Sequence, residues 1–150
     1  MSAPERRPVV LAPHYDDATL SCGGTLAAMS DAGERPLVLT IFGGEPDGPL
    51  NAFALEMHRT WGLSPAEAIQ HRRCEESHAA EILGVETAWL DLPDAIYRGE
   101  RYLSDEHLFG AVHPREATYW EAIVDALRRL FEERGIAPDP LYCPLAVGNH

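Results

Sequence analysis

The chain has 150 residues, of which 45% are hydrophobic and 24% are charged, and its formal net charge at pH 7 is −12. This length and composition are typical of a globular domain that buries a hydrophobic core. The negative charge argues against nucleic acid as a partner, because phosphate binding needs a basic surface.

Short apolar runs and helical stretches alternate in the first part of the chain. Residues 7–12, RPVVLA, are a continuous apolar run after charged residues, which is typical of a strand covered on both faces. Residues 19–33 predict a helix that ends at Gly33. Residues 36–42, PLVLTIF, are rich in β-branched side chains and predict a second buried strand. Residues 43–53 are dense in glycine and proline and are expected to form a loop.

A strong helix signal begins at Ser64. The sequence SPAE combines an N-cap serine, a proline at the first helical position and a glutamate that can close a capping box. The predicted helix runs to about Leu83, with Gly84 as its C-terminal cap. Residues 87–92, TAWLDL, predict a third strand.

A loop from Pro93 to about Thr118 is expected next, followed by a last helix and a last strand. The last helix, YWEAIVDALRRLFEER, ends before Gly135, and residues 140–147 predict the fourth strand. Six apolar side chains of that helix recur at helical spacing and are predicted to lie in the core: Trp120, Ile123, Val124, Leu127, Leu130 and Phe131.

Strands that alternate with helices are typical of an α/β fold with right-handed crossovers and a mostly parallel sheet. No repeat or linker divides the chain, so a single domain over residues 1–150 is predicted. No apolar run reaches the roughly 18 residues of a membrane span, and the N-terminus lacks the apolar segment of a signal peptide. The three cysteines are widely spaced, which disfavours a disulfide framework and predicts a cytoplasmic protein.

The sequence PHYDD follows the first predicted strand directly. Ligands of parallel α/β sheets bind beyond the carboxyl ends of the strands, so His14, Asp16 and Asp17 are placed where a site is expected. Imidazole and carboxylate groups suit zinc, and one of two adjacent carboxylates can bind metal while the other accepts a proton. Alternatively, Asp16 or Asp17 is the N-cap of the following helix.

Two further candidates have ordinary structural interpretations. Arg72 lies beside Arg73, Glu75 and Glu76, which is typical of a solvated helix face with local ion pairs. Asp94 follows Leu-Pro at a strand end and is either a turn residue or a ligand contact. Because no GxGxxG or Lys-Ser/Thr phosphate motif is present, a nucleotide-binding protein is disfavoured.

Four ordered segments resemble the PIG-L/LmbE-like deacetylases. LAPHYDDATLSCGGTLA resembles the family's opening signature, (A/S)PHPDDE before a glycine-rich helix start. HRRCEESHAAEILGV, WLDLPDA and PLAVGNH resemble its later blocks, in the same order. The resemblance implies a Rossmann-like three-layer α/β fold with a mostly parallel sheet. It also implies a zinc-dependent amidase that removes an acetyl group from N-acetylglucosamine-type sugars or related conjugates.

The resemblance assigns roles to three residues of PHYDD. His14 and Asp17 match the family's two metal ligands in this motif, and Asp16 matches its general base. The family's proline and glutamate are replaced here by Tyr15 and Ala18. These departures alter the local turn and remove an outer carboxylate.

The later blocks supply three further assignments by resemblance. Arg72 matches an arginine that contacts substrate, and Asp94 matches a residue that contacts the sugar hydroxyls. His150 matches the first histidine of a C-terminal HxxH motif, where it polarises the carbonyl and stabilises the oxyanion. The second histidine of that motif would be the third metal ligand, but the chain ends at His150, so we expect an incomplete domain.

The sequence therefore predicts a hydrolase in which water activated by Zn²⁺, or by another divalent metal, attacks an N-acetyl group. The expected partner is a small N-acyl sugar or glycoconjugate, with neither nucleic acid nor a membrane span involved. The oligomeric state stays open, a homo-oligomer included. The alternative is a non-catalytic domain of the same fold that binds a sugar or a nucleotide.

Overall fold

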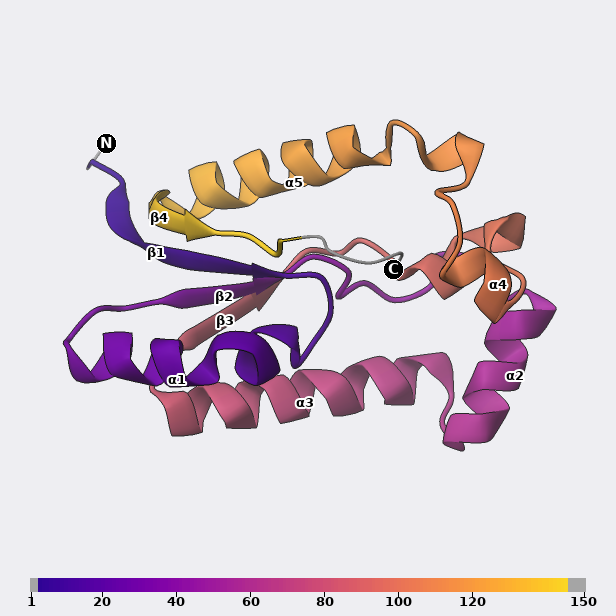
Figure 1. Cartoon of the computed structure of the whole chain (residues 1–150), viewed down its shortest axis with the longest axis horizontal. Coiled ribbons are helices and arrows are strands. Elements are labelled where there is room, and N and C mark those ends of the chain that lie inside the picture. Colours follow the sequence, from indigo (N-terminus) through magenta and orange to yellow (C-terminus); the bar gives the residue numbers. More distant parts are fainter. Residues whose placement is uncertain (1–2, 146–150) are drawn as a thin grey trace.

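A computed structural model describes residues 3–145 of the chain (Figure 1). Its helices and strands follow one another in this order: β1 (Glu5–Ala12), α1 (Asp17–Asp31), β2 (Leu37–Thr40), α2 (Ala52–Trp61), α3 (Pro65–Leu83), β3 (Glu86–Trp89), η1 (Ala95–Tyr97), η2 (Gly99–Arg101), α4 (Asp105–Leu108), η3 (Pro114–Glu116), α5 (Tyr119–Arg134) and β4 (Ile136–Tyr142).

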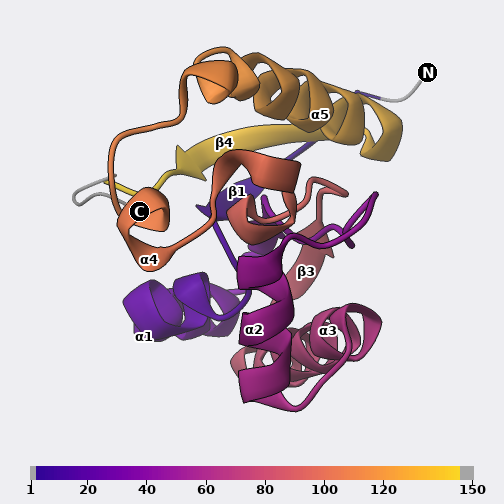
Figure 2. The ribbon, with the colours of Figure 1, turned by 90° about the vertical axis from the view of Figure 1, so that its right-hand side faces the viewer.

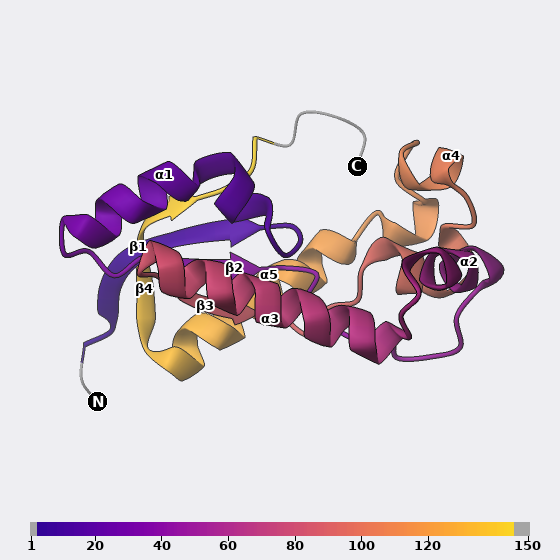
Figure 3. The same cartoon turned by 90° about the horizontal axis from the view of Figure 1, so that it is seen from below.

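The four strands form one parallel sheet in the order β3-β2-β1-β4. Helix α5 covers one face of this sheet, and α1 and α3 lie side by side on the other (Figures 1 and 3). The predicted three-layer α/β fold with a mostly parallel sheet is therefore confirmed. The short helices α2 and α4 lie beyond the carboxyl ends of the strands, at the end of the molecule that faces the viewer in Figure 2.

Each face of the sheet carries its own core. Val9 belongs to the cluster that packs against α5, whereas its neighbour Val10 packs with Leu26 of α1 on the opposite face. Successive strand residues point to opposite faces, so a strand covered on both sides needs a continuous apolar run. Leu26 is fully buried, and its replacement by alanine would cost about 2–5 kcal/mol.

The helix boundaries agree well with the capping signals. At the start of α3, the Ser64 hydroxyl accepts the Glu67 N–H, and the Glu67 carboxylate accepts the Ser64 N–H at 2.8 Å. This capping box was predicted and is confirmed. Gly84 and Gly135 end α3 and α5 with φ angles of 69° and 61°, a left-handed conformation that glycine adopts without steric cost.

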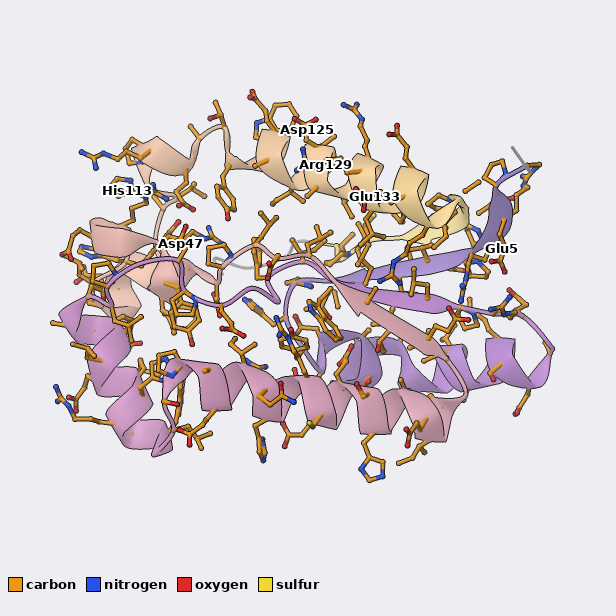
Figure 4. The ribbon with its side chains drawn as sticks, turned by 180° about the vertical axis from the view of Figure 1, so that it is seen from behind. Glu5, Asp47, His113, Asp125, Arg129 and Glu133 are labelled. Carbon is orange, nitrogen blue, oxygen red and sulfur yellow. The ribbon has the colours of Figure 1, made fainter. Side chains whose placement is uncertain are left out.

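Helix α5 is amphipathic, with one side on the sheet and the other in solvent. Asp125, Arg129 and Glu133 follow one another at four-residue spacing on its exposed side (Figure 4). Its apolar side packs against the core through Ile123, Ala126, Leu127, Leu130 and Phe131. The prediction that Trp120 lies in the core is wrong, because the first turn of α5 extends past the ends of the strands and leaves this side chain 60% exposed.

Three boundaries differ from the sequence-based expectation. Asn51, at the end of the predicted loop, is the N-cap of α2 through a hydrogen bond from the Ala54 N–H. The expected loop from Pro93 to Thr118 contains three 3-10 turns and α4. The last strand begins at Ile136 because Gly135 turns the chain directly into the sheet.

Among residues 3–145, no helix is both long and apolar enough to span a membrane.

Candidate active site

The turn from Pro13 to Asp17 connects the carboxyl end of β1 to α1. Asp16 has φ 72° and ψ −22°, and it is the only non-glycine residue with positive φ in the described part of the chain. Aspartate tolerates this left-handed conformation better than most residues. The turn thus reverses the chain at the edge of the sheet where ligands of α/β proteins bind.

His14 and Asp17 lie together in this turn. Asp17 Oδ2 accepts the His14 backbone N–H at 2.9 Å and lies 3.6 Å from His14 Nδ1. Two ligands about 2.1 Å from a tetrahedral zinc ion are separated by roughly 3.4 Å, so this imidazole–carboxylate pair fits two positions around one ion. Within residues 3–145 no group of three metal-ligating side chains forms. His150, the residue assigned by resemblance to the oxyanion, lies outside the described residues.

Asp94 lies on the far side of the His14 ring, where its Oδ1 is 3.4 Å from His14 Nε2. Burial opposes ionisation of His14, but the neighbouring Asp94 and Asp17 carboxylates raise its pKa above the ordinary value of 6.5. Burial also opposes ionisation of Asp94, yet His14 and the Ala95 N–H hold its pKa below 3.8. A carboxylate against the outer nitrogen of a histidine is a common way to orient a metal ligand.

Arg72 of α3 meets Asp16 of this turn. Arg72 Nη2 lies 3.5 Å from Asp16 Oδ1 and donates to the Tyr15 carbonyl at 3.1 Å. Asp16 occupies the N-cap position of α1, as the alternative interpretation expected, but its side chain makes no capping hydrogen bond. Its carboxylate is 59% exposed, with a guanidinium next to it, and it can accept a proton from a bound molecule.

The solvated helix face was one interpretation of Arg72 and its neighbours, and it is wrong for Glu76. Glu76 is only 4% exposed, and its Oε2 accepts the Asp16 N–H at 2.9 Å. Arg73 donates to the Tyr15 hydroxyl at 3.1 Å and to the Gly43 carbonyl at 2.8 Å. Arg72 and Glu76 share a helix face at i,i+4 spacing, a signal that could have placed both beneath the turn.

Tyr15 replaces the proline of the family signature and fixes the turn differently. Its side chain is 2% exposed, and its hydroxyl donates to the Gly43 carbonyl at 2.9 Å. A Cβ on Gly43 would lie 2.7 Å from both the Tyr15 hydroxyl and Trp89 Cβ, so only glycine fits there. These contacts hold the segment that follows β2 against the turn.

Two cavities open at this end of the sheet, and they meet at Phe42 and Asp94, which line both. The larger, of about 600 Å³, contains His14 and Asp17. The smaller, of about 420 Å³, contains Asp16. Volumes of a few hundred Å³ suit a small organic ligand.

Trp61 and Tyr97 line the smaller cavity, and the buried His58 packs against both rings. The His58 Nδ1–H donates to the Leu63 carbonyl at 3.0 Å, because a carbonyl can only accept, and this leaves Nε2 to accept from the Tyr97 hydroxyl, also at 3.0 Å. Burial raises the pKa of Tyr97 to about 12. Trp61 packs edge-on against His58 with the ring centres 5.0 Å apart, and it is 45% exposed.

A second buried carboxylate supports the larger cavity. Glu116 binds Arg98, Arg101 at 2.8 Å and the Tyr102 hydroxyl at 3.2 Å. Burial opposes the ionisation of Glu116, but Arg98 and Arg101 hold its pKa below the usual range. The Arg98 guanidinium lies between two rings, 4.6 Å from the centre of Phe42 and 4.3 Å from that of Tyr119.

Comparison with known proteins gives consistent matches. The family PIG-L, described as GlcNAc-PI de-N-acetylase, matches residues 9–150. A 2'-N-acetylparomamine deacetylase of Niallia circulans is 32% identical over 129 residues, covering 73% of this chain and 46% of that protein.

Solved structures agree with this match. A deacetylase–bog complex from the teicoplanin biosynthesis pathway superposes with a TM-score of 0.79 at 30% identity, over 97% of this chain and 57% of that one. The zinc-inhibited form of teicoplanin deacetylase gives a TM-score of 0.76 at 29% identity, over 97% and 58% of the two chains. The chain thus spans about half the length of the relatives it matches.

Proposed function

Since the chain belongs to the PIG-L family, we propose that it carries much of the active site of a metal-dependent hydrolase that removes the acetyl group from an N-acetylated aminosugar. One observation carries this proposal. A histidine–aspartate pair with zinc-ligand spacing and an exposed carboxylate beside an arginine occupy one turn at the carboxyl edge of the sheet. The match to a 2'-N-acetylparomamine deacetylase supports an N-acetyl substrate.

His14 and Asp17 would hold the metal, and Asp94 would keep the His14 ring oriented. A bound Zn²⁺ ion supplies Lewis-acid chemistry that activates water at neutral pH. Asp16 accepts the proton from the water oxygen as that oxygen bonds to the acetamide carbon. The C–N bond then breaks, and the proton passes from Asp16 to the amine nitrogen, giving acetate and the free aminosugar. Arg72 holds the Asp16 carboxylate during this transfer.

The smaller cavity is the proposed place for the sugar ring. It combines the exposed part of Trp61 with Arg72 and Asp94, which offers an aromatic surface beside donors and acceptors for hydroxyl groups. By resemblance His150 would stabilise the oxyanion, a role that stays a prediction.

The test uses the full-length protein with N-acetyl-D-glucosamine as the probe, measuring both zinc content and amine release. We expect Asp16→Asn to lower kcat by about 10²–10⁴-fold with zinc retained, because proton transfer by a side chain contributes about this much. His14→Ala should lose zinc and activity together.

Exposed positions provide matched controls for both substitutions. Asp31→Asn and His78→Ala alter the same residue types away from the turn and should change neither measurement. Full activity of Asp16→Asn would contradict the assignment of the base. A wild-type protein that binds the sugar without hydrolysing it would favour the non-catalytic binding domain instead.

A further inference from the structure

The backbone of Asp16 is held in an unfavourable conformation. An L-residue with φ 72° brings its Cβ close to the following carbonyl, and such conformations persist only where the surroundings enforce them. In this structure the enforced kink has a clear consequence. The neighbouring carboxylates of Asp16 and Asp17 line different cavities, Asp16 the smaller and Asp17 the larger.

A side chain from a distant part of the chain contacts the Asp16 backbone. Glu76, in the middle of α3, accepts the Asp16 N–H with Oε2 at 2.9 Å and is 4% exposed. Its other oxygen, Oε1, is buried with the Thr40 side chain beside it, and Arg72 is the nearby cation. The Arg72 guanidinium donates to the Tyr15 carbonyl rather than to Glu76.

This arrangement is poorly explained by stability alone. A buried carboxyl group that forms no ion pair within residues 3–145 is expensive, and an apolar side chain of similar size would be the more stable choice at a purely structural position. Burial also raises the pKa of Glu76 above its ordinary value of 4.5. Polar groups retained at such a cost are typical of functional sites.

We propose that Glu76 is a positioning residue for the candidate base: its carboxyl group holds the Asp16 backbone in the left-handed conformation and thereby aims the Asp16 carboxylate at the smaller cavity while Asp17 faces His14. The catalytic consequence rests on the proposed function. The link between Glu76 and the Asp16 backbone does not, and it can be measured without substrate or metal.

The first experiment measures amide hydrogen exchange of Asp16 by NMR in the ¹⁵N-labelled chain. Glu76→Leu fills the same space without an acceptor and should speed exchange of the Asp16 N–H at least tenfold. Glu76→Gln keeps an acceptor oxygen and should leave exchange within about threefold of wild type. The exposed Glu81 of the same helix supplies the control, Glu81→Leu, which should change nothing. If Glu76→Leu does not fold, Glu76→Ala makes the same test with a smaller side chain.

The second experiment measures kcat, KM and zinc content of the full-length variants with N-acetyl-D-glucosamine. We expect Glu76→Leu to lower kcat at least tenfold with KM and zinc content unchanged, and Glu76→Gln to restore most of kcat. Unchanged Asp16 exchange, or unchanged kcat, in Glu76→Leu would overturn the proposal. If the wild-type protein releases no amine, the proposed function fails, and the exchange rates alone decide whether Glu76 holds Asp16.

Discussion

Two buried glutamates of this protein have opposite surroundings. Glu76 and Glu116 are 4% and 5% exposed, and each lies close to the candidate active site. Both oxygens of Glu116 bind arginine, and the Tyr102 hydroxyl adds a third bond. Glu76 accepts the Asp16 backbone N–H, has the Thr40 side chain beside it, and forms no ion pair in the part of the chain that the structure describes.

The difference separates a carboxylate that stabilises the fold from one that serves the site. A buried ion pair stabilises only when its geometry and hydrogen bonds compensate the loss of water, and Glu116 meets that condition. Its partners lie between η1 and α4, so Glu116 links η3 to this segment. The desolvation of Glu76 is not compensated by arginines in this way. Buried ionisable groups of this kind are common at functional sites.

The largest change in the free energy of unfolding is expected from neutralising Glu116. Glu116→Gln leaves Arg98 buried without a counter-ion, and breaking a buried pair in this way costs about 3–5 kcal/mol. Urea denaturation at pH 7 measures the free energy of unfolding. Glu121→Gln on the exposed side of α5 is the control and should lie within about 0.5 kcal/mol of wild type. A loss below 1 kcal/mol for Glu116→Gln would mean that this network does not support the fold.

A smaller loss of folding stability is expected from Arg98→Lys. Lysine keeps the charge beside Glu116 but removes the planar group between Phe42 and Tyr119, where contacts of this kind contribute about 1–2 kcal/mol when shielded from water. The same denaturation measurement applies, with Arg129→Lys at an exposed position as the control. Equal stability of both lysine variants would show that charge alone, and not stacking, matters at position 98.

The sequence predicted those parts of the fold that depend on local signals. The capping box at Ser64 and the apolar runs of β1 and β2 determine their elements from neighbouring residues alone, and the structure contains them. Helix α2 was missed because its N-cap, Asn51, lies in a segment rich in glycine and proline, although Gly62 marks its C-terminal end. Trp120 was misplaced because periodicity does not reveal where the sheet ends.

In the candidate site, too, the residues predicted from the sequence are those that depend on local signals. The residues of PHYDD were identified from the sequence because one turn contains them all. Family resemblance assigned Arg72 and Asp94 to substrate contacts, but the meeting of Arg72 with Asp16 and of Asp94 with His14 was not predicted, since each pair joins separate elements. Glu76 was missed because its i,i+4 spacing from Arg72 was not used, and the polar composition of α3 does not show which face of the helix is buried.

The smallest effect, and the sharpest test of the comparison, is the pH dependence of Glu76→Gln. The pKa of Glu76 is raised in the folded state, so its contribution to stability is intact below about pH 4.5 and is lost as the pH rises through the folded pKa. Glu76→Gln should therefore gain stability relative to wild type between pH 4 and 7. Glu116→Gln should do the reverse, because the lowered pKa of Glu116 makes its contribution present above about pH 4.5 and lost as the pH falls. Urea midpoints at pH 4, 5, 6 and 7 measure both trends. If the stability of both variants relative to wild type changed with pH in the same direction, the two glutamates would contribute to the fold in the same manner. The distinction drawn between Glu76 and Glu116 would then be wrong.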